Sequence, residues 1–133
     1  EVIKPIHVLH GFLTVCASTI TQKTALLAWT PEAEQAKATA REVYKSRGNF
    51  LVELFKAELG LNSTRPEGAF YTMLDIRPLG DDMEIAERFL QNRVISVPGR
   101  AFGSEAEGFL RISFCNTEDL MREGVARMKD ALG

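Results

Sequence analysis

One arginine stands out because of the residues that surround it. Arg111 lies in the middle of an apolar run, Phe109–Phe114, where an unpaired guanidinium would be very costly to bury. Its N–H donors form a flat fork that matches a carboxylate through two parallel hydrogen bonds. Carboxylate binding is therefore the chemistry that this residue favours. The residues alone leave two structural alternatives open, an arginine on the wet face of an edge strand or one paired with a structural carboxylate.

A glycine-containing segment, residues 98–108, directly precedes this run. Gly99, Gly103 and Gly108 would let the backbone approach a ligand closely. Their spacing fits neither GxGxxG nor GxxxxGK[ST], so the segment is not a phosphate-binding loop. The alternative that remains open is a flexible connector.

Histidine and cysteine give weaker signals. His7 and His10 are three residues apart and share a helix face if that stretch is helical, but no further ligand follows at suitable spacing, so we expect no metal site. Cys16 and Cys115 are too few and too far apart to indicate a disulfide framework. Without a secretion signal, we expect both thiols to be reduced, as in the cytoplasm. We also expect them to pack against other side chains rather than to act as nucleophiles.

The most clearly predicted element is a long helix over residues 31–59. Thr30 is a candidate N-cap, Pro31 suits the first helical position, and Gly60 suits the position after the last turn. At 1.5 Å per residue this helix would measure ~43 Å, against roughly 36 Å for the diameter of a compact chain of this length. We therefore expect a helix that bends at Gly48 or that reaches toward a region outside this chain.

Strands and shorter helices are expected around it. A short helix through Trp29 precedes the long one, after a first stretch of 17 residues that is apolar with few charges. Alternation and β-branched residues predict strands over 69–76, 94–97 and 109–114, the second of them stopped by Pro98. Further helices follow Asp81 and a cap at Asn116 or Thr117. The residues expected to face inward on these two helices are Ala86, Phe89, Leu90, Leu120, Met121, Val125, Met128 and Leu132. The order predicts an α+β fold, with a small antiparallel or mixed sheet packed with helices.

Composition narrows the classes of partner. The 133 residues carry a formal net charge of −2, with 45% apolar and 26% charged residues, as in a globular protein. No basic face is indicated, so we expect no nucleic-acid or membrane partner. No apolar run approaches the ~18 residues that span a bilayer. The first residue is Glu1 rather than Met, and truncation is the interpretation that we favour.

Four stretches, taken together, carry a resemblance to a known family. They are HGFLTVCASTITQKTALLAW (10–29), RPEGAFYTMLDI (65–76), VISVPGRAFG (94–103) and EGFLRISFCNTEDLMREGVARMKDAL (107–132). In this order and at these separations they resemble the C-terminal third of the class I/II aminotransferases, which are pyridoxal-phosphate (PLP) enzymes of fold type I. Each motif is weak alone, but the series is specific and covers essentially the whole chain.

The resemblance implies a division into three parts. Residues 1–29 would end the large PLP-binding domain, residues 30–60 would form a long linking helix, and residues 61–133 would form the small C-terminal domain. The PLP lysine, and the aspartate and tyrosine that contact the pyridine ring, belong upstream in the family. Lys4 and Lys23 lack the setting of that lysine, so the resemblance implies that this chain alone holds no catalytic residue and is inactive.

The resemblance also implies roles for particular residues. Arg111 matches the arginine that grips the substrate α-carboxylate. Weaker candidates for the substrate pocket are Phe70, Tyr71, Gly99, Phe102 and Gly103. Val15 and Cys16 match a segment that faces the partner subunit's active site in the dimeric family. The complete protein would be a cytoplasmic homodimer that transfers an amino group between an L-amino acid and a 2-oxo acid.

Other functions remain open at this stage. A PLP lyase or synthase of the same fold, or a regulator with an aminotransferase-like domain, would share Arg111 and differ in residues outside this chain. A stand-alone non-catalytic module is a further alternative. The aminotransferase interpretation predicts exposed apolar surface on residues 1–29 and on the long helix, because a missing region would cover it.

Overall fold

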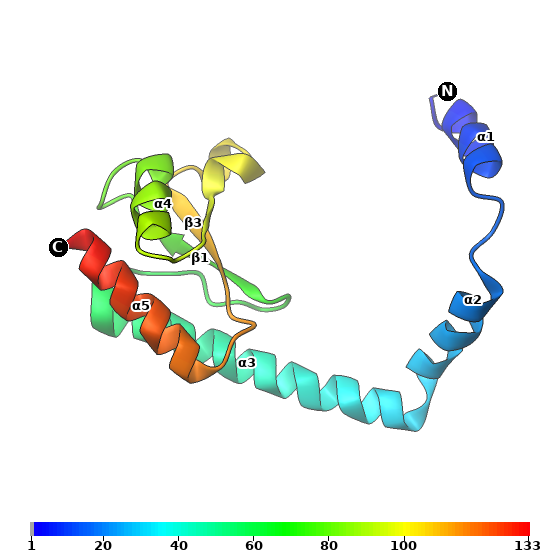
Figure 1. Cartoon of the computed structure of the whole chain (residues 1–133), viewed down its shortest axis with the longest axis horizontal. Coiled ribbons are helices and arrows are strands. Elements are labelled where there is room, and N and C mark those ends of the chain that lie inside the picture. Colours follow the sequence, from blue (N-terminus) through cyan, green and yellow to red (C-terminus); the bar gives the residue numbers. More distant parts are fainter. Residues whose placement is uncertain (1) are drawn as a thin grey trace. The chain divides into compact units, whose positions relative to one another are not determined.

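A computed structural model describes residues 2–133 and shows two compact units, which divide between residues 40 and 41. The first unit contains helix α1 (Ile3–Leu13), helix α2 (Thr19–Leu26), a 3₁₀ turn η1 (Leu27–Trp29) and the start of helix α3 (Pro31–Leu59). The second unit contains the rest of α3, a small sheet and two more helices (Figure 1). The α+β class that the sequence predicts is confirmed. In the described part of the chain, no helix combines the length and the apolar character needed to cross a membrane.

The N-terminal unit has almost no buried surface. Every residue from 2 to 29 is exposed, although much of α1 is apolar. Helix α1 itself was not predicted from the sequence. The exposed large apolar side chains of this stretch are Val2, Ile3, Ile6, Val8, Leu9, Phe12, Leu13, Val15, Ile20, Leu26, Leu27 and Trp29. The exposed apolar surface that the sequence predicts on residues 1–29 is confirmed for the described residues 2–29.

Helix α3 has the bounds that the sequence predicts. At its start the Thr30 hydroxyl accepts a hydrogen bond from the Ala33 N–H at 3.3 Å. At its end Gly60 has a φ of +68°, a left-handed conformation that glycine adopts at little cost. The helix continues through Gly48 rather than breaking there, and a side chain at this position would meet Pro66 at 2.8 Å. Gly48 therefore serves close packing within an unbroken helix.

The sheet has three antiparallel strands in the order β1-β3-β2, with β1 Tyr71–Asp75, β2 Val97–Pro98 and β3 Phe109–Ser113. The strands are shorter than predicted, and the second is displaced toward Pro98. This proline was expected to stop the strand, but it lies in an edge strand, where a missing N–H is tolerated. The last strand of the sequence, β3, therefore lies between the other two.

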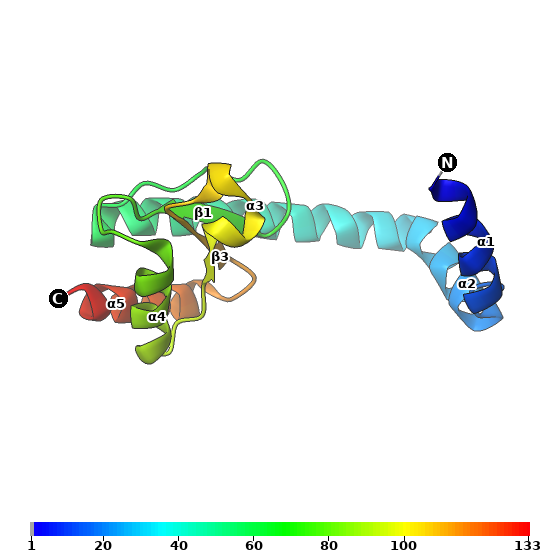
Figure 2. The same cartoon turned by 90° about the horizontal axis from the view of Figure 1, so that it is seen from above.

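Helices α4 (Asp82–Gln91) and α5 (Glu118–Leu132) complete the C-terminal unit. Asp81 is the N-cap of α4, as predicted. Of the two residues predicted as the cap of α5, Asn116 and Thr117, the structure shows Thr117 in that role. Helix α5 lies beside the second half of α3 (Figures 1 and 2), where the Lys129 Nζ is 3.0 Å from a Glu58 carboxylate oxygen.

The helices and one face of the sheet enclose a single apolar core. Its buried side chains are Leu51, Leu54, Phe55, Leu61, Leu74, Ile76, Ile85, Phe89, Leu110, Ile112, Phe114, Met121, Val125 and Met128. Two inward predictions are wrong, because Leu90 is 57% exposed and Leu120 is 52% exposed. Each of these two leucines lies next to the apolar stripe that its helix buries. The other residues predicted to face inward lie on that stripe.

Candidate functional site

Arg111 lies at the centre of the sheet. It is in the middle strand, opposite Met73 of β1 and Val97 of β2. Its neighbours Leu110 and Ile112 are buried in the core, whereas Arg111 is half-buried. Because side chains alternate along a strand, Arg111 projects from the face of the sheet that the core does not occupy.

Two aromatic rings contact the guanidinium of Arg111. Its central carbon lies 4.2 Å from the centroid of the Tyr71 ring and 4.7 Å from that of Phe102. Tyr71 begins β1 and is a diagonal neighbour of Arg111 on the sheet. Phe102 ends a 3₁₀ turn η2 (Gly99–Phe102) that directly follows β2. Three segments that are separate in the sequence therefore meet at one cation.

The side-chain hydrogen-bond donors of Arg111 have no partner within residues 2–133: neither an ion pair nor a hydrogen bond joins its guanidinium to another described residue. Ring contacts use the flat face of a guanidinium, so the N–H groups around its edge stay available for an acceptor. The middle strand is not an edge strand, and no described carboxylate pairs with this residue. Within residues 2–133, the structure therefore shows neither of the two structural alternatives considered for Arg111.

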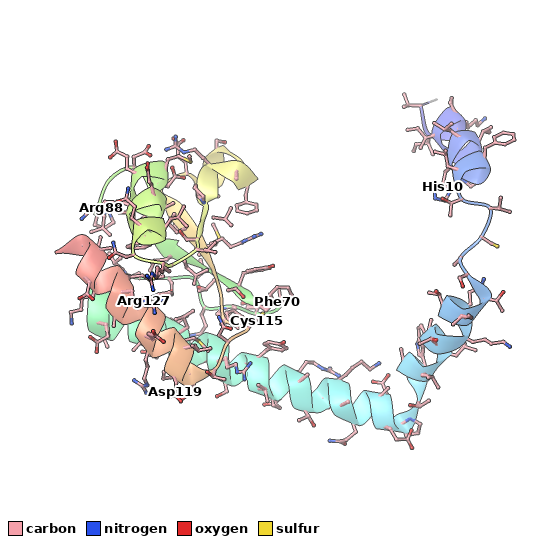
Figure 3. All side chains as sticks on the ribbon, viewed as in Figure 1. His10, Phe70, Arg88, Cys115, Asp119 and Arg127 are labelled. Atoms are coloured by element: carbon pink, nitrogen blue, oxygen red, sulfur yellow. The ribbon has the colours of Figure 1, made fainter. Side chains whose placement is uncertain are left out.

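Further rings extend this cluster toward α3. The Phe70 ring lies 4.3 Å from that of Tyr71 and 6.5 Å from that of Tyr44 on α3. The Phe114 N–H donates to the Phe70 carbonyl at 3.0 Å, so the backbone of Phe70 lies beside the end of the strand that precedes Cys115; both residues are labelled in Figure 3. Phe70 is 41% exposed, so a ligand can reach it. No sequence signal linked Tyr44 to this cluster.

The segment over residues 98–108 has regular local structure. It contains η2 and a second 3₁₀ turn η3 (Ser104–Ala106). Gly99 is buried, and a Cβ there would lie 1.8 Å from the Ala106 carbonyl oxygen, so only glycine fits. Gly103 has a φ of +117° and open space around it. Gly99 thus allows two backbone segments to touch, and Gly103 allows the chain to turn after Phe102.

An ion-pair cluster holds the turn that carries Phe102. Asp82, at the start of α4, is fully buried and accepts a hydrogen bond from the Arg100 backbone N–H at 3.0 Å. The Arg100 side chain also donates to Asp82 and to the exposed Asp81. Burial opposes ionisation of Asp82, but the hydrogen bonds from Arg100 outweigh it and hold the pKa of Asp82 below its usual 3.8. The sequence indicated Asp81 only as a helix cap and did not reveal this cluster, because Arg100 is 18 residues from Asp82 along the chain.

The remaining candidates lie elsewhere in the chain. Val15 and Cys16 are exposed and follow α1 in the N-terminal unit. Both Cys16 and Cys115 are free and exposed, so the expectation that they pack inside is wrong. His10, labelled on α1 in Figure 3, and His7 are exposed as well. No group of three or more potential metal ligands occurs within residues 2–133.

One hollow of the C-terminal unit does not have Arg111 among its lining residues. It measures about 780 Å³ and lies between α3 and residues 65–69, with Tyr44, Lys45 and Phe114 among its walls. The candidate site is therefore assigned from the chemistry of Arg111 and its rings rather than from the size of a cavity.

The described residues do not supply an anchor for PLP, the cofactor that the resemblance implies. A lysine that forms a Schiff base needs a desolvated amine or a cationic neighbour to lower its pKa. All the lysines of the chain lie on the surface in the described structure: Lys4, Lys23, Lys37, Lys45, Lys56 and Lys129. The residues whose rings contact Arg111, Tyr71 and Phe102, have no lysine next to them in the sequence. The described residues therefore place no cofactor anchor beside Arg111.

Comparison with known proteins places this arrangement in a family. Residues 1–128 match the family described as aminotransferase class I and II. The aspartate/prephenate aminotransferase of Thermus thermophilus is 38% identical over 136 aligned positions, which cover 100% of this chain and 34% of that protein. A probable N-acetyl-LL-diaminopimelate aminotransferase of Bacillus subtilis is 33% identical and is covered to 33%.

Solved structures agree with the sequence comparison. The aspartate aminotransferase of Thermus thermophilus with maleate is similar to this chain with a TM-score of 0.84 and 37% identity, over 98% of this chain and 34% of the other. The chain thus spans about a third of the length of the relatives that it matches. With a family match over nearly all of its residues and the same fold as a solved member, the chain belongs to the class I and II aminotransferases.

Proposed function

We propose that this chain is the C-terminal part of a PLP-dependent aminotransferase and that Arg111 binds the α-carboxylate of the substrate. The complete protein would transfer an amino group between an L-amino acid and a 2-oxo acid. The observation that carries the proposal is the state of Arg111, a half-buried guanidinium in the middle strand that contacts two rings and has no carboxylate partner in residues 2–133.

The chemistry of the cluster supports this role. A carboxylate that approaches the edge of the guanidinium can accept two parallel hydrogen bonds, which fix its plane as well as its position. The Tyr71 and Phe102 rings contact the cation and limit the rotation of a side chain that is otherwise flexible. Less freedom is then lost when the ligand binds. Fixing the carboxylate also orients the Cα–H bond of an amino acid, which a reaction at Cα requires.

Phe70 and the glycines have secondary roles in this proposal. Phe70 extends the aromatic wall beside Tyr71 and is exposed enough to contact a substrate side chain. Gly99 and Gly103 shape the turn that brings Phe102 to Arg111. The family uses PLP to activate the amino acid, and its anchoring lysine is assigned to a region outside this chain. We therefore expect the chain alone to be inactive.

We extend the proposal to the organisation of the complete protein. Residues 1–29 would belong to the end of the large domain, residues 30–60 would link the domains, and residues 61–133 would form the small domain. The exposed apolar side chains of residues 2–29 support this division, because such surface marks an interface. We also propose a cytoplasmic homodimer in which Val15 and Cys16 face the partner's active site. Both residues are exposed in the chain.

The test is Arg111→Lys in the complete protein. Lysine keeps the charge but loses the flat fork, so kcat/KM for an amino-acid substrate should fall on the order of 10²-fold or more, from ~1.5–3 kcal/mol per charged hydrogen bond. Arg77→Lys is the matched control. Arg77 also contacts a ring, that of Phe109, but its fork is occupied by Asp75, so kcat/KM should change less than about threefold. Near-normal efficiency of Arg111→Lys would refute the proposed role.

A further inference from the structure

We propose that Asp82 is a positioning residue for carboxylate binding: through Arg100 it holds the turn that places Phe102 against Arg111. The proposal rests on the function assigned to Arg111 above. It gives a role to a buried charged residue whose hydrogen bonds and ion pair go to Arg100 and not to Arg111.

The first step is the attachment of Arg100 to helix α4. The two oxygens of the fully buried Asp82 accept hydrogen bonds from both the main chain and the side chain of Arg100. The Arg100 Nη2 also pairs with Asp81, whose other oxygen caps α4 by accepting from the Met83 N–H at 2.8 Å. The position and the direction of Arg100 are therefore both fixed relative to the first turn of α4.

The second step runs from Arg100 to Phe102. The two residues lie in the same 3₁₀ turn, Gly99–Phe102. Gly99 fixes the start of this turn through its contact with the Ala106 carbonyl, and Asp82 fixes its second residue. The Phe102 ring is 51% exposed and contacts the Arg111 guanidinium. Since no deep packing holds this ring, its place beside Arg111 depends on how firmly the turn is attached.

The third step concerns the free-energy cost of burying the Asp82 carboxylate. Burying a carboxylate is unfavourable unless its partners are well placed, and apolar residues of similar volume are often as stabilising as a buried ion pair. The core beside α4 is formed by Ile85 and Phe89 and does not require a charge at position 82. A buried acid at the first residue of α4 is explained by the geometry that it imposes on Arg100.

The expected effect is a loss of carboxylate affinity. In the complete protein, Asp82→Asn should raise KM for the amino acid about three- to tenfold, the range expected for one cation–π contact. The value of kcat should change less than about twofold, because the carboxylate is held equally before and during the reaction. Maleate, used as a non-reacting dicarboxylate, should bind more weakly by the same factor.

A double-mutant cycle separates positioning from general loss of stability. If Asp82 acts through Phe102, Asp82→Asn should weaken maleate binding in the native background but cause no further loss in a Phe102→Leu background. Asp75→Asn is the matched control, because Asp75, the last residue of β1, is also paired with an arginine, Arg77. It should leave maleate affinity within about twofold of the parent protein.

A spectroscopic readout makes the claim independent of activity. In NMR spectra of the full chain, the Arg111 side-chain protons should carry ring-current shifts from Tyr71 and Phe102 and are assigned by their absence in Arg111→Lys. Asp82→Asn should reduce these shifts, and Asp75→Asn should not. Should Asp82→Asn fail to fold, Arg100→Lys provides the second variant, since it keeps the charge and the main-chain bond to Asp82 but removes the fork.

Two results would overturn the proposal. One is an Asp82→Asn loss of maleate affinity that persists undiminished when Phe102 is leucine. The other is an unchanged affinity and unchanged ring-current shifts in Asp82→Asn, or in Arg100→Lys where that variant replaces it. If Arg111→Lys itself leaves maleate binding intact, the proposed function fails, and the ring-current shifts still decide whether Asp82 positions Phe102.

Discussion

The two units of this chain use their apolar residues in opposite ways. In the C-terminal unit, Phe55 and Phe89 are fully buried in a core that the sheet and three helices share. In the N-terminal unit, Phe12 is 84% exposed and Trp29 is 73% exposed, and no residue from 2 to 29 is even half-buried. Both units are rich in helix, so secondary structure alone does not distinguish them.

The difference shows which part of the chain can be stabilised by its own contacts. Burial of apolar surface is the main favourable term in folding, and the C-terminal unit achieves it with residues of this chain. The helices before residue 30 do not, and short helices without tertiary packing are marginal in water. The same unit that has a core also positions Arg111, because its sheet and its turn η2 rest on that core.

The largest expected contrast is between two phenylalanines. Phe55→Ala removes a fully buried ring and should lower the free energy of unfolding of the C-terminal unit by ~3–5 kcal/mol. Phe12→Ala removes an exposed ring from α1 and should change it by less than about 0.5 kcal/mol. Urea unfolding of the full chain, followed by circular dichroism, measures both. Equal effects would show that the two units do not differ as described.

A smaller contrast is expected between two glycines. Gly99→Ala would place a methyl group 1.8 Å from the Ala106 carbonyl oxygen, and the required backbone shift should cost ~1–3 kcal/mol. Gly11 lies inside α1 with no atom near its missing Cβ, so Gly11→Ala should stabilise that helix by up to ~1 kcal/mol. Thermal unfolding of the two variants, with helix content from circular dichroism, tests the pair. A Gly99→Ala protein as stable as its parent would contradict the close contact at the turn.

The smallest expected effect is a dependence on pH that is confined to the C-terminal unit. Hydrogen bonds from Arg77 lower the pKa of Asp75, and hydrogen bonds from Arg100 lower the pKa of Asp81. Burial raises the pKa of Asp82, but the hydrogen bonds from Arg100 lower this pKa by more. A carboxyl group whose pKa is depressed on folding stabilises the fold above its unfolded pKa, and this contribution is lost as pH falls through the folded value. The Asp82→Asn variant should therefore be less stable than its parent at pH 7, and the difference should shrink below a pH of about 4.

Urea midpoints at pH 7, 5 and 3.5 measure this dependence. The neighbours of Asp82 that also carry charge are Asp81, Arg100 and, 4.0 Å from the Arg100 guanidinium, Glu107. Asp75→Asn serves as the control for acid destabilisation at a different pair. A difference between Asp82→Asn and its parent that grows as the pH falls would have the wrong sign for this account.

Much of the fold follows from local patterns in the sequence. The bounds of α3 were predictable because a threonine cap, a proline at the first position and a terminal glycine all agree with its apolar stripe. The strand around Arg111 was predictable from alternation. The position of β3 in the middle of the sheet was not, because strand order depends on long-range pairing that periodicity does not encode.

In the candidate site, too, some features follow from local sequence patterns and others depend on long-range contacts. Arg111 was identified from its type and its apolar surroundings, and the contact with Tyr71 follows from strand pairing once the register is known. The attachment of Arg100 to Asp82 was not predictable, since it joins a loop to the start of a helix that is 18 residues away in the sequence. Tyr44 was missed because the spacing of a helix stripe does not tell which of its residues reach a neighbouring loop.

The most direct test of the central claim is a crystal structure of the complete protein with maleate bound. The account predicts that one carboxylate of maleate accepts two parallel hydrogen bonds from Arg111 at about 2.7–2.9 Å, with Tyr71 and Phe102 still in contact with the guanidinium. Maleate held by other cations, with Arg111 paired to a carboxylate of the protein itself, would contradict it.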